Sequence, residues 1–329
     1  MKINNLLNEN KKITREEIDY AVDLIMNSEF YKNNKNTILK NTNFNLYHNT
    51  TVDHGNISHF DIKNREKPRD SNKAIHDIAN ELSKQQFGIE IRNKLFTTLS
   101  EFQGVVYGKF KYIVYPIGSY QLYYSNTIDD FYGDDFKISQ YKNIASKIHK
   151  YVYQSIINNN YEEIQSISEI LKFNFSNYME NVKDQYFNKY LFNHKSSTYH
   201  SILNGDEQSY YDLAHFVSIK FNELLFTDFI NLDDYVSNDD GSGDDSVFGI
   251  LESLVQKIMI QNKEDIIELI NKHFKDAIQT NYIDTIEKTK YVTELDYHSE
   301  CIIDSESVLF LSKTAKNQIV SEILRKKSK

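Results

Sequence analysis

Two histidines and one acidic run are the first groups of side chains whose types suggest chemistry. His54 and His59 stand five residues apart with Asp53 and Asp61 beside them, and such side chains are metal ligands. The stretch is polar and offers no third committed ligand, so we interpret it as a loop without a metal. The run SNDDGSGDDS at 237–246 resembles a set of calcium ligands, but it lacks the spacing and the closing glutamate of an EF-hand. A solvated linker is therefore favoured there.

The sequence contains no phosphate loop, dinucleotide glycine fingerprint, HExxH motif or nucleophile elbow. What remains is an ordered set of short pieces: LYHNT at 46–50, REKPRD at 65–70, FGIEIRNKLFTT at 87–98, QGVVYG at 103–108, YIVYPIGSY at 112–120 and DSESVLFL at 304–311. In the last piece, the two-residue spacing of Asp304 and Glu306 would put both carboxylates on one face of a strand.

In this order the pieces resemble the ADP-ribosyltransferase fold. In that fold one strand ends in His or Arg, a second bears hydroxyl groups or an aromatic ring, a helix follows, and a distant strand presents Glu. The closer resemblance, through R-x-x-P-x-D, F-G-x-x-x-R, L-F-x-T, Y-G and aromatic-P-I-G, is to a group associated with bacteriophage genomes. The resemblance covers residues 1–135 and the segment near Glu306. It implies an α+β protein with a split β-sheet core and a large helical insertion.

The resemblance implies a catalytic set of three side chains. Glu306 matches the acid, His48 matches the first-strand residue that holds the nicotinamide ribose or amide, and Tyr107 matches the aromatic residue that stacks on nicotinamide. Cleavage of the bond to nicotinamide develops an oxocarbenium-like ribose, which a carboxylate stabilises. The implied activity is a glycosyltransferase-class reaction that cleaves NAD and transfers ADP-ribose to a macromolecular acceptor, a host protein in a phage setting. It needs no metal.

The resemblance also supplies residues that would hold NAD. Thr97 and Thr98 match the strand that supports the Glu, and Asp304 completes the paired acidic motif of arginine-modifying members. Arg69 and Arg92 are expected to be pyrophosphate or structural partners, because a guanidinium fork binds phosphate oxygens in pairs. The full expected set is His48, Asn49, Arg69, Arg92, Thr97, Thr98, Tyr107 and Asp304.

One position departs from the family pattern. Asn49 stands where the family usually has Gly, which lets the backbone approach nicotinamide. A degenerate transferase fold that binds without catalysis is therefore an open alternative. The rival interpretation is a non-enzymatic phage protein that acts by binding proteins or as a virion component.

Hydrophobic periodicity predicts the elements that must position these residues. Thr14 and Glu17 form a capping box that starts a helix over 14–28, and a polar link rich in Asn and Lys follows. Further helices are expected at 71–86, 138–235 and 247–280, and strands at 44–47, 96–99, 111–117 and 305–311. The strand at 111–117 is expected to end at Gly118, and the basic tail 325–329 to be disordered.

These elements give four expected segments: an N-terminal helical segment 1–43, the first part of the core 44–137, a helical insertion 138–280 containing the linker 237–246, and the second part of the core 281–329, which carries Glu306 and the basic tail.

Composition limits the class of protein. The chain has 329 residues, 40% of them hydrophobic, so it can bury a substantial core. Its net charge of −9 disfavours bulk binding of nucleic acid, and the single Cys301 excludes an intramolecular disulfide. The first thirty residues lack a basic start followed by an apolar run, and no long apolar window occurs. We expect a cytoplasmic protein without membrane insertion, located in the host cytoplasm if phage-encoded.

Overall fold

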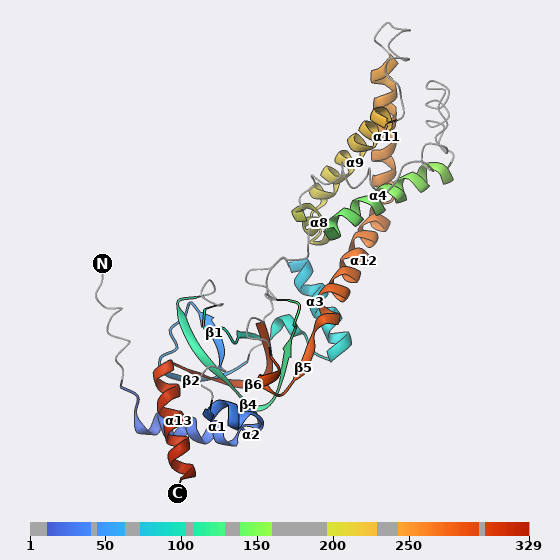
Figure 1. Ribbon diagram of the computed structural model, residues 1–329. Coiled ribbons are helices and arrows are strands. Elements are labelled where there is room, and N and C mark those ends of the chain that lie inside the picture. Colours follow the sequence, from blue (N-terminus) through green and yellow to red (C-terminus); the bar gives the residue numbers. More distant parts are fainter. Residues whose placement is uncertain are drawn as a thin grey trace, which may run out of the picture. The chain divides into compact units, whose positions relative to one another are not determined.

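Figure 1 shows the computed structural model, which describes residues 12–40, 45–62, 73–102, 108–128, 139–159, 196–228, 243–295 and 300–328. The elements are α1 Arg15–Asn27, α2 Glu29–Lys40, β1 Leu46–Thr50, β2 Ile57–Asp61, α3 Lys73–Phe87, η3 Ile91–Asn93, β3 Leu95–Thr98, β4 Phe110–Tyr124, α4 Ser139–Asn158, α8 Ser196–Leu203, α9 Glu207–Asp228, α11 Gly243–Gln261, α12 Lys263–Asn281, η7 Ile283–Thr285, β5 Glu287–Thr289, η8 Val292–Glu294, β6 Glu300–Leu311 and α13 Lys313–Lys327. The chain is α+β, as expected. It divides into two compact units: unit 1 comprises 1–71, 79–133 and 279–329, and unit 2 comprises 72–78 and 134–278.

Unit 1 is built on an antiparallel sheet that closes into a small barrel. The strand order is β2-β6-β3-β1-β4-β5, and β6 also pairs with β4, which completes the circuit β6-β3-β1-β4. The first part of β6 pairs with β3 and its last part with β2, while β4 borders β6 along most of its length. Two long strands, β4 and β6, therefore hold the sheet together.

A bulge bends β4 where the sequence predicts its end. The strand was expected to stop at Gly118, but it continues to Tyr124, so that prediction was wrong. The register with β6 shifts between Ile117 and Tyr120, and Gly118 has a φ of 83°. Glycine permits this left-handed backbone without steric cost, and a bulge redirects a strand without ending it.

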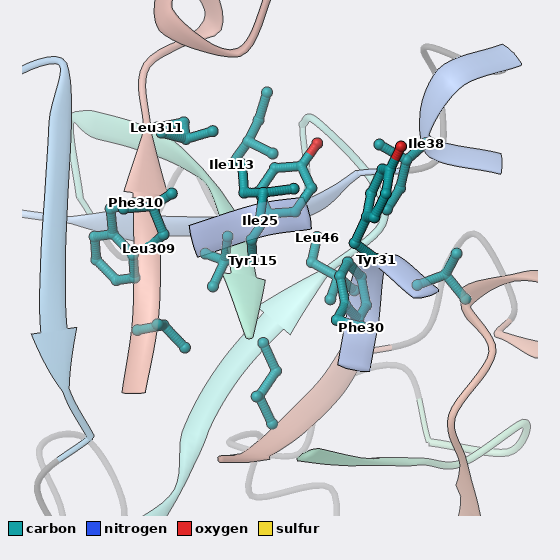
Figure 2. Close-up of a cluster of buried hydrophobic side chains, with 14 of the residues drawn as sticks. Ile25, Phe30, Tyr31, Ile38, Leu46, Ile113, Tyr115, Leu309, Phe310 and Leu311 are labelled. Carbon is teal, nitrogen blue, oxygen red and sulfur yellow. The ribbon is translucent and has the colours of Figure 1, made fainter. Parts of the chain in front are cut away.

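Two N-terminal helices pack on the barrel. The capping box of α1 is confirmed, because Thr14 Oγ1 accepts from the Glu17 N–H and the Glu17 carboxylate accepts from the Thr14 N–H. The segment expected to be a polar link is helix α2. Its apolar residues Phe30, Tyr31 and Ile38 are buried in the core of unit 1 (Figure 2), so tertiary packing outweighs its polar composition.

Helix α13 corrects the expectation of a disordered tail. The helix runs to Lys327, and the buried carboxylate of Glu322 accepts from Arg15 of α1 at 2.6 Å and from Arg325 at 2.5 Å. These hydrogen bonds, from Arg325 and then Arg15, lower the pKa of Glu322 to about 2. The ion pairs join α13 to α1 and order the basic end of the helix.

Unit 2 consists of helices in the part of the chain that the structure describes. The imidazole of His149 stacks on Phe221 with ring centroids 4.5 Å apart, and Tyr210 donates a 2.6 Å hydrogen bond to the Met259 carbonyl. Burial lowers the pKa of His149 to about 3. Across the described ranges, no helix combines the length and apolar character needed to cross a membrane.

Candidate functional site

His48 is the central residue of β1, one of the strands of the barrel. It sits on β1 directly opposite Tyr112 of β4, and its Nδ1 is 2.8 Å from the Phe96 carbonyl oxygen of β3. A carbonyl oxygen only accepts, so Nδ1 carries the proton and Nε2 has the lone pair in the neutral ring. The neighbouring strands therefore fix both the orientation and the tautomer of His48, the residue expected to hold nicotinamide.

An aromatic cluster centred on Phe310 includes His48. The Phe310 ring lies 5.3 Å from His48 and from Phe60, 5.5 Å from Tyr112 and 5.6 Å from His54. Tyr112 stacks on Phe310 at 18°, whereas His54 and Phe60 meet it edge to face. This packing supports the barrel with geometries that aromatic rings favour.

The loop between β1 and β2 is tied to the same cluster. The Tyr112 hydroxyl accepts from the His54 N–H at 2.7 Å and donates to Asp53 at 3.0 Å. Asp53 also accepts from the N–H of Gly55, whose φ is 77°. Burial lowers the pKa of His54 against a smaller, opposing effect of Asp53, so the neutral imidazole is favoured.

The neighbouring Asn49 is buried at a close backbone approach. Its Nδ2 donates to the Gly108 carbonyl at 3.4 Å, and its Oδ1 has no hydrogen-bond partner within the described ranges. A Cβ at Gly108 would lie 2.1 Å from the Thr50 carbonyl carbon, so this crossing requires glycine. Tyr107, expected to stack on nicotinamide, and Arg69, expected at the pyrophosphate, lie outside the described residues.

Glu306 lies on another part of the sheet. Tyr47, next to His48, pairs with Thr98 of β3, which pairs with Glu300 of β6. Tyr47 also pairs with Ile113 of β4, which pairs with Leu311 of β6. Glu306 stands between these positions, six and five residues away, or about 17–20 Å along an extended strand. It is exposed at the bulge, and its backbone carbonyl accepts from the Ile62 N–H. The register therefore does not bring His48 and Glu306 together.

The other expected NAD ligands make contacts within the protein. Asp304 forms a 3.0 Å ion pair with Lys94, and Thr97 donates to the Cys301 carbonyl at 2.9 Å. Thr98 accepts from the Ser100 N–H at 3.1 Å in the following turn.

Arg92 is also buried. Its backbone N–H donates to Asn80 at 2.9 Å, and its guanidinium lies over the Tyr282 ring at 5.6 Å from the centroid. Thr97 and Thr98 lie on β3 beside the strand of His48, whereas Asp304 lies on β6 two residues before Glu306.

The two histidines of the possible metal pair have separate partners. His54 belongs to the Phe310 cluster, whereas His59 hydrogen-bonds to Tyr20 and Ser307, each at 3.0 Å. Among the described residues, no three or more His, Cys, Asp or Glu side chains gather in a group that could hold a metal ion. The role of Ser307 was missed because its histidine partner is nearly 250 positions away in the sequence.

Charge is distributed unequally between the two units. Unit 2 has 14 Lys and Arg against 24 Asp and Glu, a net charge of −10, while unit 1 has 24 against 23, a net charge of +1. The net negative charge of the chain therefore belongs to unit 2.

Unit 2 also contains a groove of about 390 Å³. It is lined by Lys147 of α4 and by four residues of α12: Asp265, Glu268, Leu269 and Lys272.

No protein-family model matches the sequence, and no curated protein or solved structure matches the chain.

Proposed function

We propose that this protein acts by binding a basic polypeptide through its helical unit. The observation that carries the proposal is the charge difference, −10 in unit 2 against +1 in unit 1. A net charge on one part of a molecule attracts partners of opposite charge and speeds their encounter. This function belongs to the binding class that the sequence left as the alternative to a transferase.

Helix α12 supplies a defined part of the proposed surface. Glu264, Glu268 and Asp276 are exposed on it. Exposed ion pairs contribute about 0.2–1 kcal/mol each, so neutralising three such carboxylates should weaken binding about tenfold. Screening by salt should weaken it further.

The test compares two triple variants of equal charge. One carries Glu264→Gln, Glu268→Gln and Asp276→Asn in unit 2. The control carries Glu16→Gln, Asp61→Asn and Glu81→Gln, which remove three exposed carboxylates from unit 1. Binding of a fluorescent peptide rich in Lys and Arg is measured by anisotropy at low and high salt. We expect a loss of affinity in the first variant alone, and equal affinities of the two variants would contradict the proposal.

NAD cleavage with transfer of ADP-ribose is the second candidate function. It is favoured by the fixed tautomer of His48 and by the exposed Glu306, whose carboxylate has no ion pair or hydrogen bond within the described ranges. In this proposal His48 contacts the nicotinamide end of NAD and Glu306 is the acid. The separation along β6 means that the chain would have to bring them together when NAD binds. This proposal includes the expectation that the sheet of unit 1 is a split β-sheet of the ADP-ribosyltransferase type.

The second candidate is tested with NAD labelled on its adenylate. The pure protein is incubated with the label, alone and with bacterial lysate, and both free nicotinamide and labelled macromolecules are measured. Loss of both products in Glu306→Gln, but not in the exposed control Asp61→Asn, would support it. Equal rates in Glu306→Gln would remove that residue from the mechanism. No product and no thermal shift with NAD would contradict the candidate itself.

A further inference from the structure

Three side chains from α1, β2 and β6 form a hydrogen-bonded chain on unit 1. Tyr20 Oη lies 3.0 Å from His59 Nδ1, and His59 Nε2 lies 3.0 Å from Ser307 Oγ. A hydroxyl bound to an imidazole, whose other nitrogen is held by a third group, is the arrangement that activates a nucleophile. We propose that Ser307 is a nucleophile toward carboxylic esters, with His59 as its general base and Tyr20 as a positioning residue.

The pairing of β2 with β6 brings His59 and Ser307 together. His59 pairs with Leu309 and Asp61 pairs with Ser307, so His59 and Ser307 are diagonal neighbours on one face of the sheet. Diagonal neighbours lie about 7–8 Å apart, a separation that an imidazole and a hydroxymethyl group span. The contact is therefore set by strand register.

The contact with Tyr20 is compatible with the imidazole tautomer that acts as a base toward Ser307. In the productive tautomer, the Tyr20 oxygen accepts the Nδ1 proton, and the lone pair of Nε2 accepts the Ser307 proton. Tyr20 is 52% exposed, so its phenolic hydroxyl faces solvent and can donate its proton there while its oxygen accepts from Nδ1. The tyrosine orients the ring as a carboxylate does in other activated serines, but without a full charge.

The bulge of β4 lies beside this serine. Ile117 pairs with Ser307 and Tyr120 with Ser305, which leaves Gly118 and Ser119 outside the regular ladder and exposed. Bulges often adjoin active sites because they interrupt regular pairing and redirect side chains. Ser307 is 9% exposed while His59 is exposed. This limited access favours small acyl groups.

The proposed reaction has two steps. Ser307 Oγ bonds to the ester carbonyl carbon while its proton passes to His59 Nε2, and the bond to the leaving alcohol then breaks as that alcohol takes the proton. The product is an ester on Ser307. Water attacks this ester with His59 as base, which releases the carboxylic acid and restores the hydroxyl.

Labelling by an alkyl fluorophosphonate tests the nucleophile directly. Ser307 Oγ bonds to phosphorus, fluoride leaves, and His59 takes the proton, so the full-length chain gains one mass adduct. We expect the adduct to map to Ser307, to disappear in Ser307→Ala and to persist in the exposed control Ser119→Ala. General-base catalysis contributes about 10²–10⁴-fold, so His59→Gln should slow labelling at least 10²-fold.

Tyr20 variants separate positioning from packing. Tyr20→Phe should slow labelling, and Tyr20→Glu, whose carboxylate accepts the Nδ1 proton, should restore it, whereas a packing role would not be restored. Melting temperatures establish that each variant is folded. No adduct, an adduct on another residue, or equal rates in His59→Gln and the parent would overturn the proposal. These outcomes are independent of peptide binding by unit 2.

Discussion

Replacing Phe310 by alanine removes the ring at the centre of the barrel's aromatic cluster. Phe310 is 5% exposed, and four rings surround it with centroids 5.3–5.6 Å away. A buried Phe→Ala change costs about 3–5 kcal/mol, and each lost ring pair adds about 0.5–1.5 kcal/mol. The four pairs share one ring and are not additive. We therefore expect the free energy of unfolding to fall by about 4–5 kcal/mol.

The assay must report on unit 1 separately from unit 2. Hydrogen exchange of peptides from β4 and β6, measured across a urea titration, does so because those strands belong to the barrel. Phe102→Ala is the matched control, since it makes the same change in a ring that is 78% exposed. Its effect should stay within about 0.5 kcal/mol. A loss below about 1 kcal/mol for Phe310→Ala, or equal losses in both variants, would refute the reasoning.

Three further predictions concern backbone space and pH. Gly108→Ala should lower the free energy of unfolding by about 1–3 kcal/mol or more, and the melting temperature with it, because the added Cβ would meet the Thr50 backbone at 2.1 Å. The control Gly249→Ala in α11, where nothing lies near the added Cβ, should stabilise the protein by up to about 1 kcal/mol. The contribution of Glu322 is present above its unfolded pKa and is lost as pH falls toward about 2, so a stability profile of Glu322→Gln should be flatter in that range. Burial lowers the pKa of His149 to about 3, against 6.5 for this histidine in the unfolded chain. Unit 2 should therefore lose stability as the pH falls below 6.5, because the unfolded chain then binds a proton that the folded chain does not. His149→Phe should remove this pH dependence in circular dichroism melts.

The sequence predicts elements best where local signals decide the structure. The Thr14 capping box sets the start of α1, and the period of apolar residues identifies the helices of unit 2. Helix α2 was missed because its stability comes from Phe30, Tyr31 and Ile38 packing on residues far away in the chain. Gly118 was misread because a positive φ serves both turns and bulges, and only the partner strand distinguishes them.

The candidate site was harder to predict than the elements. The sequence places His48 near a strand end, but its aromatic surroundings depend on Phe310, more than 260 positions later. The order of motifs carries no information on register, so the separation of His48 from Glu306 required the ladders of β3, β4 and β6. His59 and Ser307 meet through another such ladder, between β2 and β6.

The closed circuit of unit 1 also affects the order of events during synthesis. Strand β4 ends at Tyr124 and β6 begins at Glu300, and almost all of unit 2 is translated between them. At about 5–20 residues per second, the interval is about 9–35 s. Throughout that time β3, β1 and β4 lack β6, which closes the circuit between β3 and β4, so the outer edges of β3 and β4 are open to pairing with other chains. Ribosome-bound chains halted before residue 300 should therefore bind chaperones through the early strands, and release them once β6 has emerged.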